Sequence, residues 1–144
     1  MLYFTYSAML DPDLLQSVAP NAKFLYIAHL PEAKLTFPTP DGRPSVQPAP
    51  GHTVWGAIFE VSSKEAAAIE KAESSEGRKP RTDLRAVDRA GNKYDVVTFS
   101  HPAGDGDHTP DSEYLERVVK GARHWNLPTG WVAGLEDLGE DALI

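Results

Sequence analysis

The feature of this 144-residue chain that most constrains its fold is the apolar run at residues 54–61. Its apolar side chains fall on both faces of an extended strand, which is typical of a strand in the middle of a sheet. Directly after the run, Ser62 and Glu65 have the spacing of a capping box, so a helix is expected to extend to about Ser75. The run is also far too short to cross a membrane. It therefore predicts a central strand followed at once by a helix.

The rest of the chain is expected to hold more strands than helices. Strands are predicted at residues 2–6, 23–29 and 33–37, with a turn at Pro31, and as a hairpin at 82–88 and 93–100. Helices are predicted at residues 12–18 and 111–126, the latter the longest, with a short final helix capped by Thr129. Loops are predicted at the proline-rich residues 38–51, with room for one short extended piece, and at 103–107. Because strands and helices do not alternate regularly, we expect an α+β fold. It would form a single domain over residues 1–144, with a mostly antiparallel or mixed, barrel-like sheet and a few flanking helices.

Charge and composition argue against several classes of protein. The formal net charge is −7, so the surface is expected to repel nucleic acid and anionic membranes. One basic cluster runs from Arg78 to Arg81 and continues with Arg85 and Arg89. We interpret it as a solvated loop and strand edge, because no aromatic residues interleave it as in a nucleic-acid patch. A positive field that attracts a carboxylate-bearing substrate is a further use that the pattern leaves open.

Cysteine is absent, and the five histidines show no metal-ligand spacing. Neither a disulfide framework nor a metal site is therefore expected. The first residues lead straight into a strand pattern, without the basic and apolar regions of a signal peptide. These observations together predict a cytoplasmic protein.

Three segments of the chain resemble the γ-glutamylcyclotransferase-like (AIG2-like) family. Residues 110–128 read P-x-S-x-Y up to Tyr114, then carry Gly-Ala in a helix and end in Leu-Pro. Residues 2–10, LYFTYSAML, stand where the family has F-x-Y-G-S-N-L. Val54-Trp55-Gly56 matches the family's V-x-G strand, and Glu73 follows at the distance of its catalytic glutamate. The resemblance covers most of the chain and implies the family's fold.

Glu73 is the candidate catalytic residue. On the expected helix it follows Ile69 by one turn, so its carboxylate would lie at the edge of the buried stripe, where desolvation raises the pKa of a carboxyl group. The pattern alone leaves open an ordinary solvated glutamate. The resemblance places Glu73 on the family's glutamate, although that residue normally precedes a glycine and here precedes Ser74. Glu76 does precede a glycine and is the alternative base.

The resemblance also implies an acid/base reaction that needs no metal or cofactor. In the family, the glutamate takes a proton from the α-ammonium of a γ-glutamyl amine or amino acid. The freed amine attacks its own γ-carbonyl, and 5-oxoproline and a free amine are released. Because the attack is intramolecular, orientation supplies much of the acceleration, and amide donors stabilise the oxyanion. The expected partner is thus a small γ-glutamyl substrate.

The substrate-binding residues that the resemblance implies come from the first turn and the last long helix: Tyr3, Phe4, Thr5, Tyr6, Ser7, Ala8 and Tyr114. In the family, the turn surrounds the glutamyl head with backbone N–H groups. Ser7, Ala8 and Met9 replace the family's glycine, serine and asparagine. Met9 either packs into the core beneath the turn or alters glutamyl recognition. The second interpretation keeps two alternatives open: a non-catalytic member of the fold that binds a small ligand or a protein, and an enzyme acting on another amide. Tyr114 either packs in the core or presents its hydroxyl to the site.

Overall fold

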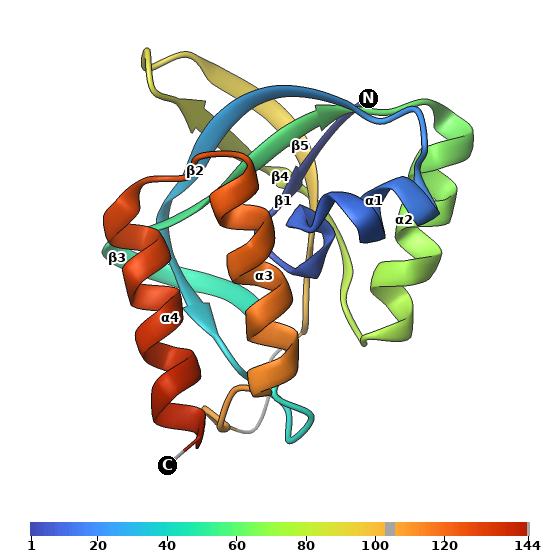
Figure 1. Ribbon diagram of the computed structural model, residues 1–144. Coiled ribbons are helices and arrows are strands. Elements are labelled where there is room, and N and C mark those ends of the chain that lie inside the picture. The colour runs from blue at the N-terminus through green and yellow to red at the C-terminus, as the bar shows by residue number, and fades with distance from the viewer. Residues whose placement is uncertain (103–105, 144) are drawn as a thin grey trace.

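The computed structural model describes residues 1–102 and 106–143, where five strands close into a barrel (Figure 1). These are β1 (Leu2–Thr5), β2 (Lys23–Thr36), β3 (Ser45–Glu60), β4 (Lys79–Asp88) and β5 (Lys93–Ser100). Their order around the barrel is β1-β3-β2-β4-β5. Neighbouring strands are antiparallel except β1 and β5, which are parallel where they close the barrel. The α+β class and the mixed, barrel-like sheet are confirmed. Part of the loop predicted at 103–107 lies outside the described residues.

The predicted central strand is the second half of β3, which pairs with β1 on one side and β2 on the other. Val54, Ile58 and Phe59 in this stretch are buried, as the apolar run predicted. At Gly56, a Cβ atom would overlap the carbonyl oxygen of Thr5 and the ring of Phe4. Glycine therefore allows β1 to lie tightly against β3, which fixes the position of the turn that follows β1.

One prediction about strands and one about a loop were wrong. The strands expected at 23–29 and 33–37 are one strand, β2, with a register shift between Pro31 and Ala33. Glu32 takes a positive φ of 54° at this point, so the chain bulges and the strand continues. The predicted loop at 38–51 is shorter than expected, because β3 already begins at Ser45. Within the described strands, the first part of β3 pairs with β2 alone, and such an edge tolerates proline.

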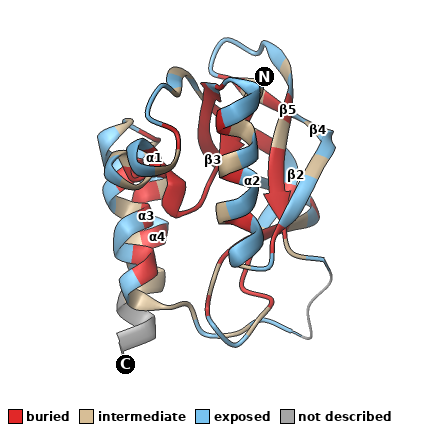
Figure 2. Ribbon diagram, turned by 90° about the vertical axis from the view of Figure 1, so that its right-hand side faces the viewer, coloured by how far each residue is buried: buried red, intermediate tan, exposed pale blue. Residues whose placement is uncertain are grey.

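The helices are α1 (Pro12–Val18), α2 (Ser63–Ser75), α3 (Ser112–His124) and α4 (Thr129–Leu143), with a 3-10 turn, η1 (Ala8–Leu10). The capping box predicted at Ser62 and Glu65 is present. Helices α3 and α4 lie side by side on one side of the barrel, and α2 lies on another (Figure 1). In Figure 2 the buried residues gather in the barrel strands and along α3. No helix in the described residues is long and apolar enough to cross a membrane.

The final helix differs from its prediction. Helix α4 has 15 residues and α3 has 13, so α3 is not the longest. Thr129 is the first residue of α4, and the carbonyl of Pro128 accepts hydrogen bonds from Trp131 and Val132. The Trp131 side chain packs against both hydrophobic clusters of the core, which ties α4 to the barrel.

Helix α3 packs closely on η1, the turn that follows β1. A Cβ atom at Gly121 would overlap the backbone of Leu10 and Asp11. Nearby, the indole nitrogen of Trp125 donates to the Leu10 carbonyl at 2.8 Å. Glycine at position 121 therefore allows α3 to approach this turn closely. This packing holds the first turn of the chain against α3.

Candidate active site

The C-terminal cap of α2 brings a carboxylate and a guanidinium together. Gly77 has a φ of +83°, a conformation that glycine adopts at little cost. The N–H of Arg78 donates to the Glu73 carbonyl at 3.2 Å, and the N–H of Gly77 donates to that of Ser74 at 3.0 Å. This pair of bonds is a Schellman motif. It turns the chain back across the helix end, so that the Arg78 side chain reaches the Glu73 carboxylate.

Glu73 is a buried carboxylate, with 3% of the residue exposed. Its neighbour one turn earlier, Ile69, is also buried, so the face predicted from the helical spacing is confirmed. Oε1 of Glu73 lies 3.1 Å from Nη2 of Arg78. Burial raises the pKa of Glu73 above its ordinary value, while the charge and hydrogen bond of Arg78 lower it. A raised pKa suits a base that must later return its proton.

Arg78 is the residue that the sequence interpretation misplaced. Only 2% of it is exposed, although its cluster was expected to be solvated. Its Nη2 contacts Glu76 Oε2 at 2.5 Å and Tyr114 Oη at 3.2 Å, and its Nη1 donates to the Pro44 carbonyl at 2.9 Å. Two carboxylates and these hydrogen bonds compensate the cost of burying the charge. Next to it, Lys79 is exposed, as expected.

Tyr114 links three segments of the chain. Its hydroxyl donates to Glu76 Oε2 at 2.9 Å and accepts from the Ala8 N–H at 3.2 Å. Burial is the main cause that raises the pKa of Tyr114 to about 12, so the hydroxyl stays protonated near neutral pH. Its side chain is buried, and its hydroxyl faces the site. Tyr114 thus joins α3, the first turn and the cap of α2.

In β1 and the turn after it, alternate side chains pack into the two different hydrophobic clusters of the core. Tyr3 lies in the cluster between barrel and helices, and its hydroxyl is buried without a partner among the described residues. Burial raises the pKa of Tyr3, and the negative charge of Glu73 raises it further. The Tyr3 hydroxyl therefore interacts electrostatically with this carboxylate. Phe4 and Tyr6 pack inside the barrel, where the Tyr6 hydroxyl donates to the Phe99 carbonyl at 2.5 Å. The structure therefore brings the Tyr3 side chain toward Glu73 and turns the Phe4 ring into the barrel.

Thr5 and Ser7 hydrogen-bond to each other. The Ser7 N–H donates to Thr5 Oγ1 at 3.3 Å, and the two hydroxyls lie 3.4 Å apart. Met9 is buried in the cluster between barrel and helices. It packs into the core beneath the turn, as one of the two interpretations predicted. The altered residues therefore form an ordered turn, and its Ala8 N–H points at the Tyr114 hydroxyl.

A cavity of about 330 Å³ leads from the surface to Glu76 and Tyr114. It is lined by Ala8, Leu14, Arg43, Glu76, Asp111, Glu113, Tyr114 and Arg117. Arg43, which sequence reasoning did not single out, lies over the Tyr114 ring with Cζ 4.5 Å from its centroid. Its Nη1 is 3.9 Å from Glu76 Oε1. The cavity mouth therefore carries cationic and anionic groups around a single tyrosine.

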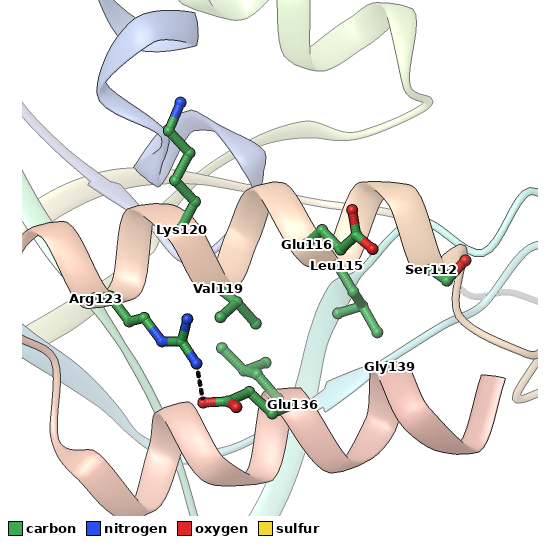
Figure 3. A pocket seen from close by; sticks show the side chains of 9 residues that line it. Ser112, Leu115, Glu116, Val119, Lys120, Arg123, Glu136 and Gly139 are labelled. Atoms are coloured by element: carbon green, nitrogen blue, oxygen red, sulfur yellow. Dashed lines mark ion pairs between the residues drawn. The ribbon is translucent and has the colours of Figure 1, made fainter. Parts of the chain in front are cut away.

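A larger cavity of about 560 Å³ lies between α3 and α4. Figure 3 shows Leu115 and Val119 in it beside the ion pair of Arg123 and Glu136, whose atoms are 2.8 Å apart. None of the predicted site residues lines this cavity. It also shares no lining residue with the cavity at Glu76 and Tyr114, so it is separate from the candidate site.

Comparisons with known proteins agree with this fold. The model of the AIG2-like family matches residues 53–135. A γ-glutamylcyclotransferase from Bos taurus is 24% identical over 138 residues, which cover 88% of this chain and 72% of the relative. A solved structure named γ-glutamyl cyclotransferase superposes with a TM-score of 0.84 at 19% identity, covering 94% of this chain and 85% of the other. YkqA from Bacillus subtilis superposes with a TM-score of 0.82 at 19% identity, covering 97% of this chain and 54% of the other.

Proposed function

The chain belongs to the AIG2-like family, and we propose that it is a γ-glutamylcyclotransferase-like enzyme with Glu73 as its acid/base residue. The substrate would be a γ-glutamyl amine or γ-glutamyl amino acid, and the products 5-oxoproline and the free amine. The observation that carries the proposal is the convergence of three segments at one buried place. The Glu73 carboxylate, the Tyr114 hydroxyl and the turn holding Ala8 are joined there through Arg78 and Glu76.

The reaction would begin when Glu73 accepts a proton from the substrate's α-ammonium. The α-nitrogen then attacks the γ-carbonyl carbon, the carbon–nitrogen bond to the leaving amine breaks, and a five-membered lactam remains. The α-nitrogen loses two protons in all, and the leaving nitrogen gains two, so no water is consumed. Attack within one molecule requires mainly that the substrate be held folded. The Ala8 N–H, which donates to the Tyr114 hydroxyl in this structure, would have to exchange that bond for one to the developing oxyanion.

Glu73 suits the base better than Glu76 does. Burial raises the pKa of Glu73, whereas the Glu76 side chain is 23% exposed and lines the cavity. The Glu76-Gly77 pair, which kept Glu76 as an alternative, is accounted for by the helix cap. We assign Glu76 the role of holding the Tyr114 hydroxyl and the Arg78 guanidinium.

The test is release of 5-oxoproline from a panel of γ-glutamyl amines and γ-glutamyl amino acids. Wild-type protein is compared with Glu73→Gln, which removes the base but keeps the shape, and with Glu70→Gln as the control. Glu70 lies on the exposed face of the same helix. We expect release by the wild type and the control and at least a 100-fold loss in Glu73→Gln, in line with typical acid/base contributions of about 10²–10⁴. Equal release by all three proteins would reject Glu73 as the base.

A second candidate, a non-catalytic member that binds a small ligand or a protein, is favoured by one observation. Arg78 already occupies the position beside Glu73 Oε1 where a cationic substrate group would bind. Under this alternative, γ-glutamyl compounds bind without turnover, or do not bind at all. Calorimetric titration with the same panel, followed by analysis of the recovered ligand, separates binding alone from conversion.

A further inference from the structure

Arg78 contacts three polar side chains at the centre of the candidate site. Its Nη2 atom lies within 3.2 Å of oxygens from Glu73, Glu76 and Tyr114. Its Nη1 atom is held by the carbonyl of Pro44, from the loop between β2 and β3. The Schellman motif fixes its backbone against the end of α2. Both ends of this side chain are therefore anchored, and its position does not depend on a bound substrate.

We propose that Arg78 is a positioning residue of this site, which holds Glu73 ionised and fixes its carboxylate relative to Glu76 and Tyr114. The inference rests on the function proposed above and adds a residue that the sequence resemblance did not supply. Arg78 acts through Glu73 and not through a contact with the substrate.

The charges around Glu73 explain why a cation is needed there. Burial disfavours the ionised form, and Glu76, at the end of the same helix, adds a second negative charge. Tyr114 from α3 and Tyr3 and Tyr6 from β1 and its turn face the same group as neutral phenols. Arg43 lies at the outer side of Glu76, 3.9 Å from it, and is partly exposed. Arg78 is thus the buried cation that lets Glu73 lose its proton.

The geometry also leaves Glu73 able to act. Arg78 bonds to Oε1, and no hydrogen bond from the described residues reaches Oε2. One oxygen is therefore tied to the guanidinium, and the other is the oxygen to which we assign the proton transfer. A carboxylate held at one oxygen keeps its orientation, and small errors in the position of a base reduce the rate strongly.

The test uses Arg78→Met, which keeps the apolar stem but removes the charge, and Arg81→Met as a matched control. Arg81 is a neighbouring arginine whose ion pair with Asp83 lies on the surface. For each protein, 5-oxoproline release is measured from pH 5 to pH 9, and the carboxyl carbon of Glu73 is titrated by NMR after isotopic labelling.

We expect Arg78→Met to move both midpoints to higher pH by about 1–3 units, the usual effect of an adjacent arginine on a carboxylate. Arg81→Met should titrate like the wild type. If the wild type releases 5-oxoproline but Arg78→Met keeps the wild-type midpoints, the inference is overturned and the proposed function stands. If the wild type releases none, the proposed function fails, and the NMR midpoint still decides whether Arg78 keeps Glu73 ionised.

Arg78→Lys keeps the test valid if the methionine variant does not fold. Lysine retains the charge, but its single nitrogen cannot bond the three oxygens that Nη2 contacts and also hold the Pro44 carbonyl as Nη1 does. We expect its acid midpoint to stay within about half a pH unit of the wild type, while kcat falls about tenfold or more and KM changes little. A wild-type kcat in this variant would show that the fixed arrangement is not required.

Discussion

The close packing of α3 on the first turn can be tested at Gly121. An alanine there would place its Cβ against the backbone of Leu10 and Asp11. These atoms cannot move singly, because the Leu10 N–H is bonded to the Ser7 carbonyl at 3.0 Å and the Leu10 carbonyl accepts from Trp125 at 2.8 Å. The helix and the turn must therefore separate as units.

The magnitude follows from two opposing effects. Overpacking of a rigid contact costs about 1–3 kcal/mol. Alanine gains about 1 kcal/mol over glycine inside a helix. Because the obstacle at Gly121 is backbone, we take the upper part of the first range and expect a net loss of about 1–2 kcal/mol. Gly134→Ala is the control, since nothing lies within 4 Å of a Cβ at that position of α4. It should raise stability by up to about 1 kcal/mol.

Urea unfolding, followed by the fluorescence of the three tryptophans, gives both values from the shift in midpoint. The separation should also draw the Ala8 N–H away from the Tyr114 hydroxyl, now at 3.2 Å. Release of 5-oxoproline should accordingly fall in Gly121→Ala and not in Gly134→Ala. A Gly121→Ala protein that unfolds at the same urea concentration as the wild type, or higher, would refute the account of this contact.

Three further predictions concern single groups. Tyr114→Phe removes one of the two donors to Glu76 Oε2 and leaves the Ala8 N–H without its acceptor. Urea unfolding should therefore show a loss of about 1–3 kcal/mol, and unchanged stability would contradict the observed network. Ser62→Ala removes the capping box of α2 and should lower the free energy of unfolding by about 0.5–2 kcal/mol in the same assay. The kcat of this variant should stay at the wild-type value, and a large fall in kcat would contradict a purely structural role of Ser62. The value of kcat/KM should fall as the pH drops through the raised pKa of Glu73. The midpoint of this acid limb should therefore lie above the ordinary pKa range of a glutamate. A midpoint at or below that range would argue against a buried base.

Local signals predicted the elements well where they were self-contained. The capping box at Ser62 set the start of α2, and the apolar run at 54–61 identified the central part of the barrel. The spacing of Ile69 and Glu73 predicted that both lie on the buried face. Each of these depends on neighbours within one or two helical turns or along one strand, which the sequence shows directly.

The errors depended on partners far away in the sequence. β2 continues through Pro31 because β3 pairs with it on both sides of the bulge, and no local pattern contains that pairing. Arg78 is buried because Glu73, Glu76 and Tyr114 surround it, whereas its flanking residues suggested solvent. The available signal was Gly77, which follows a predicted helix end and so indicates a chain reversal toward the helix.

The most direct test of the proposed intramolecular reaction is the product mass after turnover in water enriched in oxygen-18. Cyclisation consumes no water, so 5-oxoproline should appear without the heavy isotope, and Glu73→Gln run in parallel should yield only the uncatalysed background. Hydrolysis of the same γ-glutamyl bond would instead give glutamate with one heavy oxygen. Cyclisation with Glu73 as the base predicts unlabelled 5-oxoproline from the wild type alone. Labelled glutamate, or no conversion above background, would contradict it.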